Sequence, residues 1–310
     1  MEITPLEQLV SANEQFGQTR KRKASPNKNL GSGTQRYYRT QLRSLVSLIS
    51  KEIEAEVMPI VKQEKNQYQT DSVPTMDGWS DRVIAALRRL TELFMSSRFT
   101  SQYERLAART VFMAESDSTS AFVKSVKQSV GVDIGPILSS RGISEYLDVS
   151  TYQNAQLIKS VPQNYLDRVE AAVIGGIRDG KSPTTISKTI RAATGITKRQ
   201  ADTIARDQTA KLTSEITERR QKQAGLIYYR SVDAGDIRVT GRPGGKYPNA
   251  KISCWGIARK DVGYGPGVYR LDTGASWGGQ TGLHPGRHHI QCRCTSSPVF
   301  EFELPEKAKK

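Results

Sequence analysis

Apolar side chains recur at helical spacing near the start of the chain. The clearest stripe has members three or four positions apart: Leu42, Leu45, Val46, Ile49, Ile53 and Val57. This spacing puts the side chains on one face of an α-helix, so it predicts a helix that starts at Tyr37. Pro59 lacks a backbone N–H and is expected to kink or end this helix. Residues 62–78 are polar and are expected to form a connection.

Three further apolar stripes precede residue 150. A second helix is predicted by Val83, Leu87, Leu90 and Phe94. A third is predicted over residues 101–115 and a fourth over residues 117–130. This part of the chain contains no group of side chains typical of a catalytic site. We therefore expect residues 37–149 to form a helical region.

Glycine and proline divide the pattern between residues 150 and 225. A helix that carries Leu166 and Val173 is expected to end at Asp179-Gly180, because glycine often ends helices. Ser182-Pro183 is expected to open a short helix, since proline suits the first turn, and Thr194-Gly195 is expected to end it. A long helix is predicted over about residues 198–223, with Ala224-Gly225 as its end.

The composition changes after Gly225. Residues 226–232 are rich in aromatic and β-branched side chains and predict a strand, as do residues 268–271 and 295–300. Glycine and proline clusters between these segments predict long loops. We expect an α+β fold, in which a mainly helical N-terminal region precedes a helix-plus-small-antiparallel-sheet domain over residues 150–300. Residues 301–310 are expected to be a charged tail.

The first 36 residues have too little apolar surface to offset the entropy lost on ordering. We expect residues 1–36 to be a flexible basic arm that an anionic or protein partner can order. Its most basic run is Arg20, Lys21, Arg22 and Lys23, which are the candidate contacts to DNA or a partner.

The whole chain is basic, with 46 Lys and Arg against 31 Asp and Glu and a formal net charge of +15. Such an excess attracts polyanions, of which nucleic acid is the usual one, without reading their sequence. No apolar run approaches the ~18–20 residues that span a bilayer, so no membrane segment is expected. The first residues also lack the pattern of a secretory signal, and we expect folding in the cytoplasm of a host cell.

All three cysteines and all three histidines lie between residues 254 and 294. The odd number of cysteines argues against a disulfide framework. Thiolates and imidazoles are the ligands that Zn²⁺ prefers in tetrahedral structural sites. The candidate ligands of a structural zinc ion are Cys254, His284, His289, Cys292 and Cys294. The alternative is that the thiols are buried as ordinary core residues, which free cysteines often are.

Catalytic interpretations find less support. A cysteine beside a histidine also begins a thiol-hydrolase site, but no orienting group or oxyanion hole is identifiable. Residues 263–267 contain Gly-x-Gly without the strand-to-helix context of a dinucleotide site, and no P-loop is present. Asp233 and Asp236 flank Gly235 and suit a turn better than a carboxylate pair. We predict no catalytic residue and no enzyme; the alternative is a metal-dependent nuclease that uses the Cys/His cluster.

Several features follow one another in a characteristic order. They are the segment Asn154 to Pro162, Ala205-Arg206-Asp207-Gln208-Thr209, the stop at Ala224-Gly225, Asp236-Ile237-Arg238-Val239, and Pro285 through Cys294. Over about residues 150–300 this ordered set resembles the phage Mu F-type head-morphogenesis family. The chain departs from the family pattern at Gln208, at Ile290 and after Val239, where Thr240-Gly241-Arg242-Pro243 lacks an expected histidine.

The resemblance implies a minor capsid protein of a tailed bacteriophage that aids head assembly and DNA packaging or ejection. It implies a place in the virion, inside the head or at the portal vertex. The implied partners are the portal protein, the major capsid or scaffolding protein, and phage DNA. It also implies a structural role for the residues that carry the motifs: Arg206, Asp207, Asp236, Arg238, His289, Cys292, Arg293 and Cys294. We expect Arg206 and Asp207 to be an ion pair that braces the long helix against the C-terminal strands.

Overall fold

A computed structural model describes residues 5–15, 21–25, 27, 29–67, 79–138 and 142–308. The chain divides into two compact units. One, here called the helical unit, consists of Gln35–Thr110 and Ser150–Arg206. The other, here called the mixed unit, consists of Met1–Thr34, Val111–Val149 and Asp207–Lys310. Each unit is therefore assembled from separate segments, whereas the sequence suggested a linear division at residue 150.

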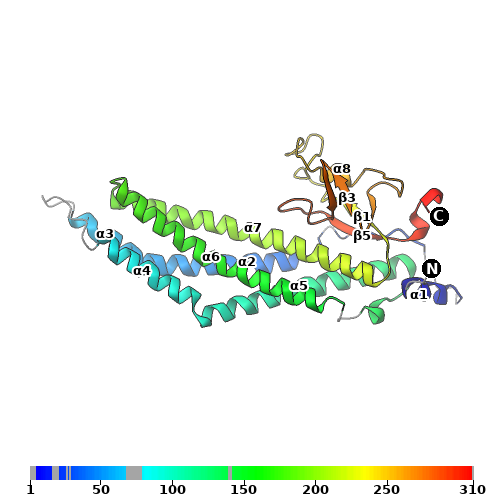
Figure 1. Cartoon of the computed structure of the whole chain (residues 1–310), viewed down its shortest axis with the longest axis horizontal. Helices are drawn as coiled ribbons and strands as arrows, with labels where there is room; N and C mark the ends of the chain where they lie inside the picture. The colour runs from blue at the N-terminus through cyan, green and yellow to red at the C-terminus, as the bar shows by residue number, and fades with distance from the viewer. Residues whose placement is uncertain are drawn as a thin grey trace. The chain divides into compact units, whose positions relative to one another are not determined.

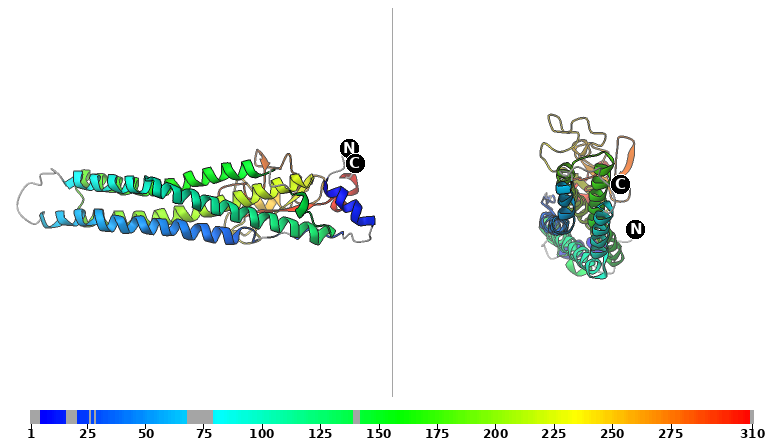
Figure 2. Two further views of the ribbon diagram at one scale, coloured as in Figure 1. Left: turned by 90° about the horizontal axis from the view of Figure 1, so that it is seen from below. Right: turned by 90° about the vertical axis from the view of Figure 1, so that its left-hand side faces the viewer.

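In the described residues of the helical unit, parts or all of six α-helices run alongside one another (Figures 1 and 2). They are α2 (Ser32–Glu52), α3 (Met58–Gln67), α4 (Trp79–Met95), the start of α5 (Ser97–Val130), most of α6 (Ser144–Arg178) and the first part of α7 (Pro183–Gln223). The predicted apolar stripes meet in its interior, where Leu42, Val46, Ile49, Val83, Leu90 and Phe94 are buried. No helix among the described residues has a stretch long and apolar enough to cross a membrane.

Pro59 distorts the helix before it, as predicted, but does not end the helical path. A short π-helical segment, Ile53–Val57, joins α2 to α3, and Pro59 is the second residue of α3. Proline cannot donate a backbone hydrogen bond and collides with the carbonyl four residues earlier, so the preceding turn widens. Ile53 and Val57 remain buried across the distortion.

Two predicted helix breaks are wrong. Residues 101–115 and 117–130 belong to the single helix α5, and Gly195 lies inside α7 instead of ending a shorter helix. A glycine inside a helix costs about 1 kcal/mol relative to alanine. The burial of Ile190, Ala193 and Ala201 on both sides of it offsets that cost. At Gly225 the prediction is confirmed: α7 ends before this residue, which has a φ of 81°.

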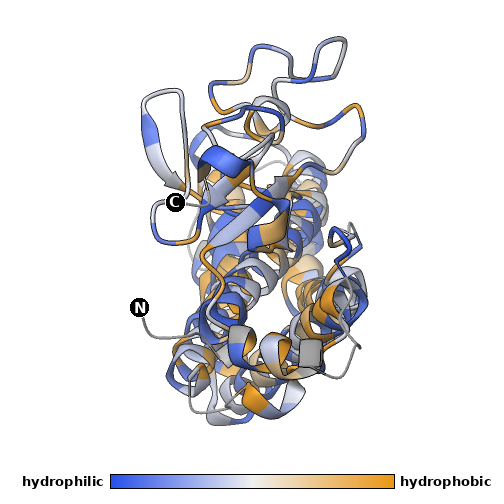
Figure 3. Cartoon of the chain, turned by 90° about the vertical axis from the view of Figure 1, so that its right-hand side faces the viewer, coloured by the Kyte–Doolittle hydropathy of each residue, from blue (hydrophilic) through white to orange (hydrophobic). Residues whose placement is uncertain are grey.

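The mixed unit carries two small antiparallel sheets, which confirms the α+β class. The predicted strands form one sheet, in which β1 (Tyr228–Val232) lies between β2 (Val268–Arg270) and β5 (Thr295–Val299). An additional hairpin, β3 (Ala275–Trp277) and β4 (Gln280–Leu283), and the short helix α8 (Cys254–Ile257) were not expected. Apolar and polar residues are interspersed along these elements and their long loops (Figure 3).

The N-terminal segment has more structure than the expected flexible arm. Residues Pro5–Gln15 form α1, and α2 begins at Ser32 rather than Tyr37. Leu6 and Ala24 are buried against apolar side chains of α5, and the N–H of Arg22 donates to the carbonyl of Ser129 at 3.0 Å. A few apolar contacts are thus enough to place this segment. The side chains of Lys21, Arg22 and Lys23 are exposed, whereas Arg20 lies outside the described residues.

Candidate metal centre

Four buried side chains of the mixed unit meet at one point. They are Cys254, His288, Cys292 and Cys294, and their ligand atoms all lie within 4.8 Å of one another. Cys254 is the first residue of α8, whereas the other three belong to the segment between β4 and β5. The structure therefore contains a Cys₃His cluster that could hold a metal ion.

The spacing of the donor atoms fits a tetrahedral ion. With Zn–S near 2.3 Å and Zn–N near 2.0–2.1 Å, the edges of a tetrahedron are about 3.8 Å between sulfurs and about 3.5 Å between sulfur and nitrogen. The Sγ atoms of Cys254 and Cys292 are 3.9 Å apart, and Cys254 Sγ is 3.3 Å from His288 Nδ1. The other ring nitrogen of His288 is buried and has no hydrogen-bond partner among the described residues. The ring thus meets Cys254 through Nδ1.

Local hydrogen bonds fix the position of Cys254. The hydroxyl of Ser253 accepts the N–H of Gly256 at 2.8 Å and so caps α8. The N–H of Cys254 donates to Thr240 Oγ1 at 3.1 Å. Thr240 thus supports the cluster through its hydroxyl.

A turn held by α7 positions Cys292. Gln291 has a φ of 60°, a left-handed conformation that costs about 1–2 kcal/mol for residues other than glycine. Asp207 Oδ1 accepts the N–H of Gln291 at 2.9 Å, and Asp207 also pairs with Lys211 at 2.7 Å. The sequence predicted that Asp207 braces α7 through an ion pair with Arg206. In the structure, Asp207 accepts the N–H of Gln291 and forms an ion pair with Lys211. Arg206 belongs to the helical unit.

A second brace holds the residue between the two neighbouring cysteines. Both terminal nitrogens of Arg293 donate to the carboxylate of Asp236, at 2.5 and 2.7 Å. This pairing lowers the pKa of Asp236 to about 2. Asp236 also accepts the N–H of Arg238 at 2.9 Å, which confirms the predicted turn, and Asp233 accepts the N–H of Gly235 in the same way. Arg238 thus contributes its backbone to this turn.

The three thiols interact strongly with one another. Hydrogen bonding from Cys254, and then from Cys294, holds the pKa of Cys292 well below its usual value, although burial opposes this. The same contact with Cys292 raises the pKa of Cys254 to about 12, and hydrogen bonding to Cys254 raises the pKa of Cys294. Crowded thiols cannot all ionise without a cation to neutralise them. A bound metal ion would supply that positive charge and convert all three into thiolates.

The histidines differ from the predicted ligand set. His288, which was not predicted, is in the cluster, and His284 is not. His284 Nδ1 lies 3.6 Å from Glu218, and its ring stacks on Tyr229 with centroids 5.4 Å apart. His289 Nε2 is 3.3 Å from Cys254 Sγ and 3.4 Å from Thr240 Oγ1, so it contacts one sulfur from outside the four-donor group. His288 and His289 thus both reach Cys254, whereas His284 lies beside Glu218, and spacing alone does not reveal this difference.

The chemistry of this cluster is that of a closed site. Four protein donors fill a tetrahedral coordination shell, whereas catalytic zinc sites keep one position for water or substrate. The donors are buried, and a reactive catalytic cysteine is normally partly exposed. The arrangement favours a structural over a catalytic role.

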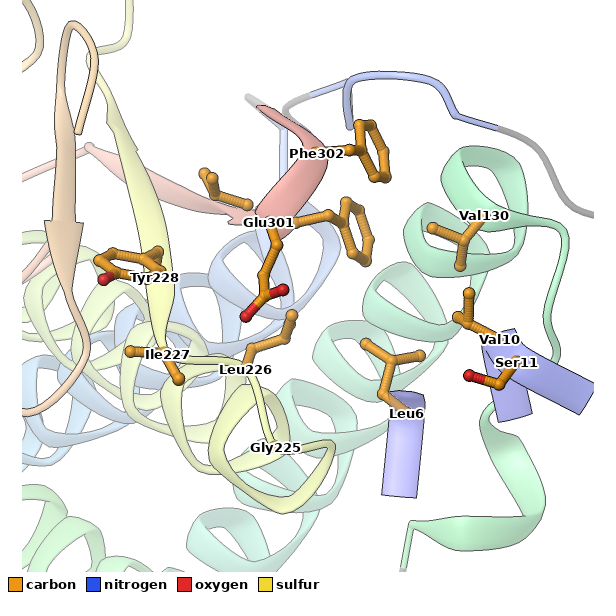
Figure 4. Close-up of a pocket in the computed structure, with 12 residues that line it drawn as sticks. Leu6, Val10, Ser11, Val130, Gly225, Leu226, Ile227, Tyr228, Glu301 and Phe302 are labelled. Carbon is orange, nitrogen blue, oxygen red and sulfur yellow. The ribbon is translucent and has the colours of Figure 1, made fainter. Parts of the chain in front are cut away.

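An apolar cavity of about 180 Å³ lies elsewhere in the mixed unit (Figure 4). Leu6, Val10, Val130, Leu226 and Phe302 are among the side chains around it. Glu301 and Tyr228 contribute ionisable groups to its lining, and no histidine or cysteine is among the described residues that line it. One carboxylate and one phenol, without a histidine, a cysteine or a second acid, do not form a typical acid–base pair or a metal-ligand set.

The chain is similar to an uncharacterized protein of Haemophilus influenzae, with 26% identity over 283 residues. The match covers 91% of this chain and 56% of the relative, so the chain spans little more than half the length of the relative that it matches. No family model matches the chain. No solved structure matches it either.

Proposed function

We propose that this chain is a minor head protein of a tailed bacteriophage, in which a structural Zn²⁺ ion held by Cys254, His288, Cys292 and Cys294 stabilises the mixed unit. In this proposal the protein acts in head assembly and in DNA packaging or ejection, inside the head or at the portal vertex. It is not an enzyme.

One observation carries the proposal: residues from three of the ordered motifs lie around the cluster. Asp207, Asp236 and Arg293 are far apart in sequence, yet each holds the turn or the segment that presents Cys292 and Cys294. Motifs that together stabilise one structural element are typical of a protein with a structural role. This convergence supports the resemblance to the head-morphogenesis family more strongly than any single motif.

Zinc suits the cluster for chemical reasons. Three thiolates and one imidazole are a common structural zinc set, and softer donors of this kind disfavour Mg²⁺ and Ca²⁺. Around the cysteines, the buried apolar cluster consists of Val239 and the three cysteines, so a metal crosslink would add stability where the core is small.

The expected partners are the portal protein, the major capsid or scaffolding protein, and phage DNA. The N-terminal segment supports the last of these. Its backbone is anchored through Arg22, while the side chains of Arg22 and Lys23 are exposed and can be reached by phosphates.

The decisive experiment is mass spectrometry of purified virions from the phage or induced prophage that encodes the chain. The proposal expects the protein in the virion in few copies, and crosslinks to the portal protein. Absence from washed virions, with the protein present in the lysate, would overturn it. Elemental analysis of the isolated protein tests the metal separately, with one zinc per chain expected.

The nuclease alternative makes a different prediction. If the cluster were catalytic, Cys292→Ser and Cys294→Ser would give folded proteins that had lost measurable DNA cleavage. If the cluster is structural, the same variants lose metal, stability and assembly, and the parent protein has no cleavage activity to lose.

A further inference from the structure

Two tryptophans flank an open cavity beside the metal cluster. Trp255 follows Cys254 in α8, and Trp277 ends β3, which lies against α8 in the mixed unit (Figure 1). Both side chains are partly exposed and line a cavity of about 710 Å³. This volume lies within the ~300–1,000 Å³ typical of sites for organic ligands.

Glycines keep the two rings accessible. The ring of Trp277 lies against Gly256, where a Cβ atom would overlap it. Gly278 and Gly279 form the turn of the β3–β4 hairpin with φ angles of 58° and 79°, and they have no side chains to cover the cavity. The backbone conformation of these glycines thus leaves the aromatic surface open.

Positive charges lie directly over the rings. The guanidinium of Arg259 is 4.5 Å from the centroid of the Trp255 ring, and Lys260 Nζ is 5.9 Å from that of Trp277. Both distances fall within the ~6 Å reach of cation–π attraction. Both cations line the cavity, and Lys260 is exposed.

Carboxylates compensate this charge only in part, because Asp233 pairs with Arg259. Among the described residues that line the cavity there is no Asp or Glu. Between residues 226 and 294 there are ten Lys and Arg against four Asp. Each aspartate is held by a group of the same segment: Asp233 by Arg259, Asp236 by Arg293, Asp272 by Arg270, and Asp261 by the N–H groups of Gly263 and Gly265.

We propose that this cavity, the tryptophan cavity, binds single-stranded nucleic acid. Unpaired bases stack on Trp255 and Trp277, and a flanking phosphate pairs with Lys260. Stacking requires a free base face, which a duplex covers. An acidic peptide would satisfy the cations but not the two aromatic faces. The proposal uses none of the N-terminal cations and does not depend on the assignment to a phage head.

Fluorescence provides the direct test. The chain has three tryptophans, so the zinc-loaded full-length Trp79→Phe variant reports only on Trp255 and Trp277. A short oligothymidylate is expected to quench the emission and to bind more weakly as salt rises. An abasic oligonucleotide of the same length is expected to bind about tenfold more weakly, because it keeps the phosphates and lacks the bases. Equal affinity for the two would overturn the proposal.

Two variants separate stacking from charge. Trp277→Leu is expected to weaken oligothymidylate about tenfold and leave the abasic binding unchanged. Lys260→Gln, at an exposed position, is expected to weaken both and to reduce the salt dependence by about one ion.

Tyr247→Leu is the matched control, since Tyr247 is exposed, has Lys246 Nζ 5.6 Å from its ring, and does not line the cavity. An equal loss in Tyr247→Leu and Trp277→Leu would overturn the proposal. So would polyglutamate that competes as well as the oligonucleotide, which would indicate an acidic protein partner. Loss of the near-ultraviolet circular dichroism of Trp277→Leu would mean that this variant is misfolded. The Lys260→Gln variant and the abasic oligonucleotide would then still test the proposal.

Discussion

The carboxylate of Asp207 on α7 accepts the backbone N–H of Gln291 at 2.9 Å. Gln291 is the residue directly before Cys292, and among described residues other than glycine it alone has a positive φ. The side chain of Asp207 therefore holds a strained turn in place, and that turn positions Cys292, a candidate metal ligand.

This relationship predicts that Asp207 controls metal affinity without touching the metal. Asp207→Asn is expected to weaken zinc binding about 10–100-fold, the usual effect of removing a group that orients a ligand. Competition with a chromophoric chelator measures this. Asp272→Asn is the matched control, because Asp272 pairs with Arg270 in the same unit and is far more exposed. Equal affinities of the Asp207 and Asp272 variants would contradict the prediction.

Side-chain exchange at Gln291 tests the strain. Gln291→Gly is expected to preserve or raise the free energy of unfolding, because glycine adopts a φ of 60° without steric cost. Gln291→Val should lie at least about 1 kcal/mol below the glycine variant, since a β-branched residue tolerates this conformation poorly. Denaturant titrations of the two zinc-loaded variants provide the comparison. A valine variant as stable as the glycine variant would show that the turn relaxes.

The histidines can be told apart by metal content. His288→Ala is expected to lose the zinc ion or bind it orders of magnitude more weakly, because His288 lies in the four-donor cluster. His284→Ala should keep one zinc per chain, because His284 lies beside Glu218. Elemental analysis and the spectrum of the cobalt-substituted proteins distinguish the outcomes. If only His284→Ala lost the metal, His284 would be a ligand, as the sequence predicted, and His288 would not.

The Asp236–Arg293 pair should have a characteristic pH dependence. The folded-state pKa of Asp236 is lowered to about 2, so its contribution is complete above the unfolded value and is lost as the pH falls through about 2. The pair is partly exposed, so we expect a contribution below about 1 kcal/mol. The metal-free protein and its Asp236→Asn variant should differ constantly from pH 7 to about pH 4 and converge near pH 2. A gap that widens on acidification would contradict this sign.

Two glycines of the helical unit should respond in opposite directions to alanine. Gly195→Ala is expected to stabilise the protein by about 0.5–1 kcal/mol, since the nearest atom to the new Cβ would be Arg199 at 4.0 Å. Gly176→Ala should destabilise it, since that Cβ would lie 2.5 Å from Ile186 Cγ1. Thermal melts of the two variants test this, and equal shifts would show that Ile186 moves aside.

By itself, the sequence determined the elements whose signal is local. The apolar stripes at Leu42–Val57 and Val83–Phe94, the end of α7 at Gly225 and the three strands of the main sheet are all present. Periodicity, helix-ending glycine and β-prone composition act within a few residues, so they can be read without the fold. The concentration of cysteine and histidine between residues 254 and 294 likewise pointed to the candidate metal centre.

Only the tertiary structure decided what depends on packing between distant segments. On local propensity, Gly195 is expected to end a helix. The helix α7 continues past Gly195 because the neighbouring residues are buried. Each histidine is held by residues far away in sequence: His288 contacts Cys254, whereas His284 lies beside Glu218 and stacks on Tyr229. The cluster therefore contains His288 and not the predicted His284. A side chain in an irregular loop takes its orientation from the contacts that hold the loop.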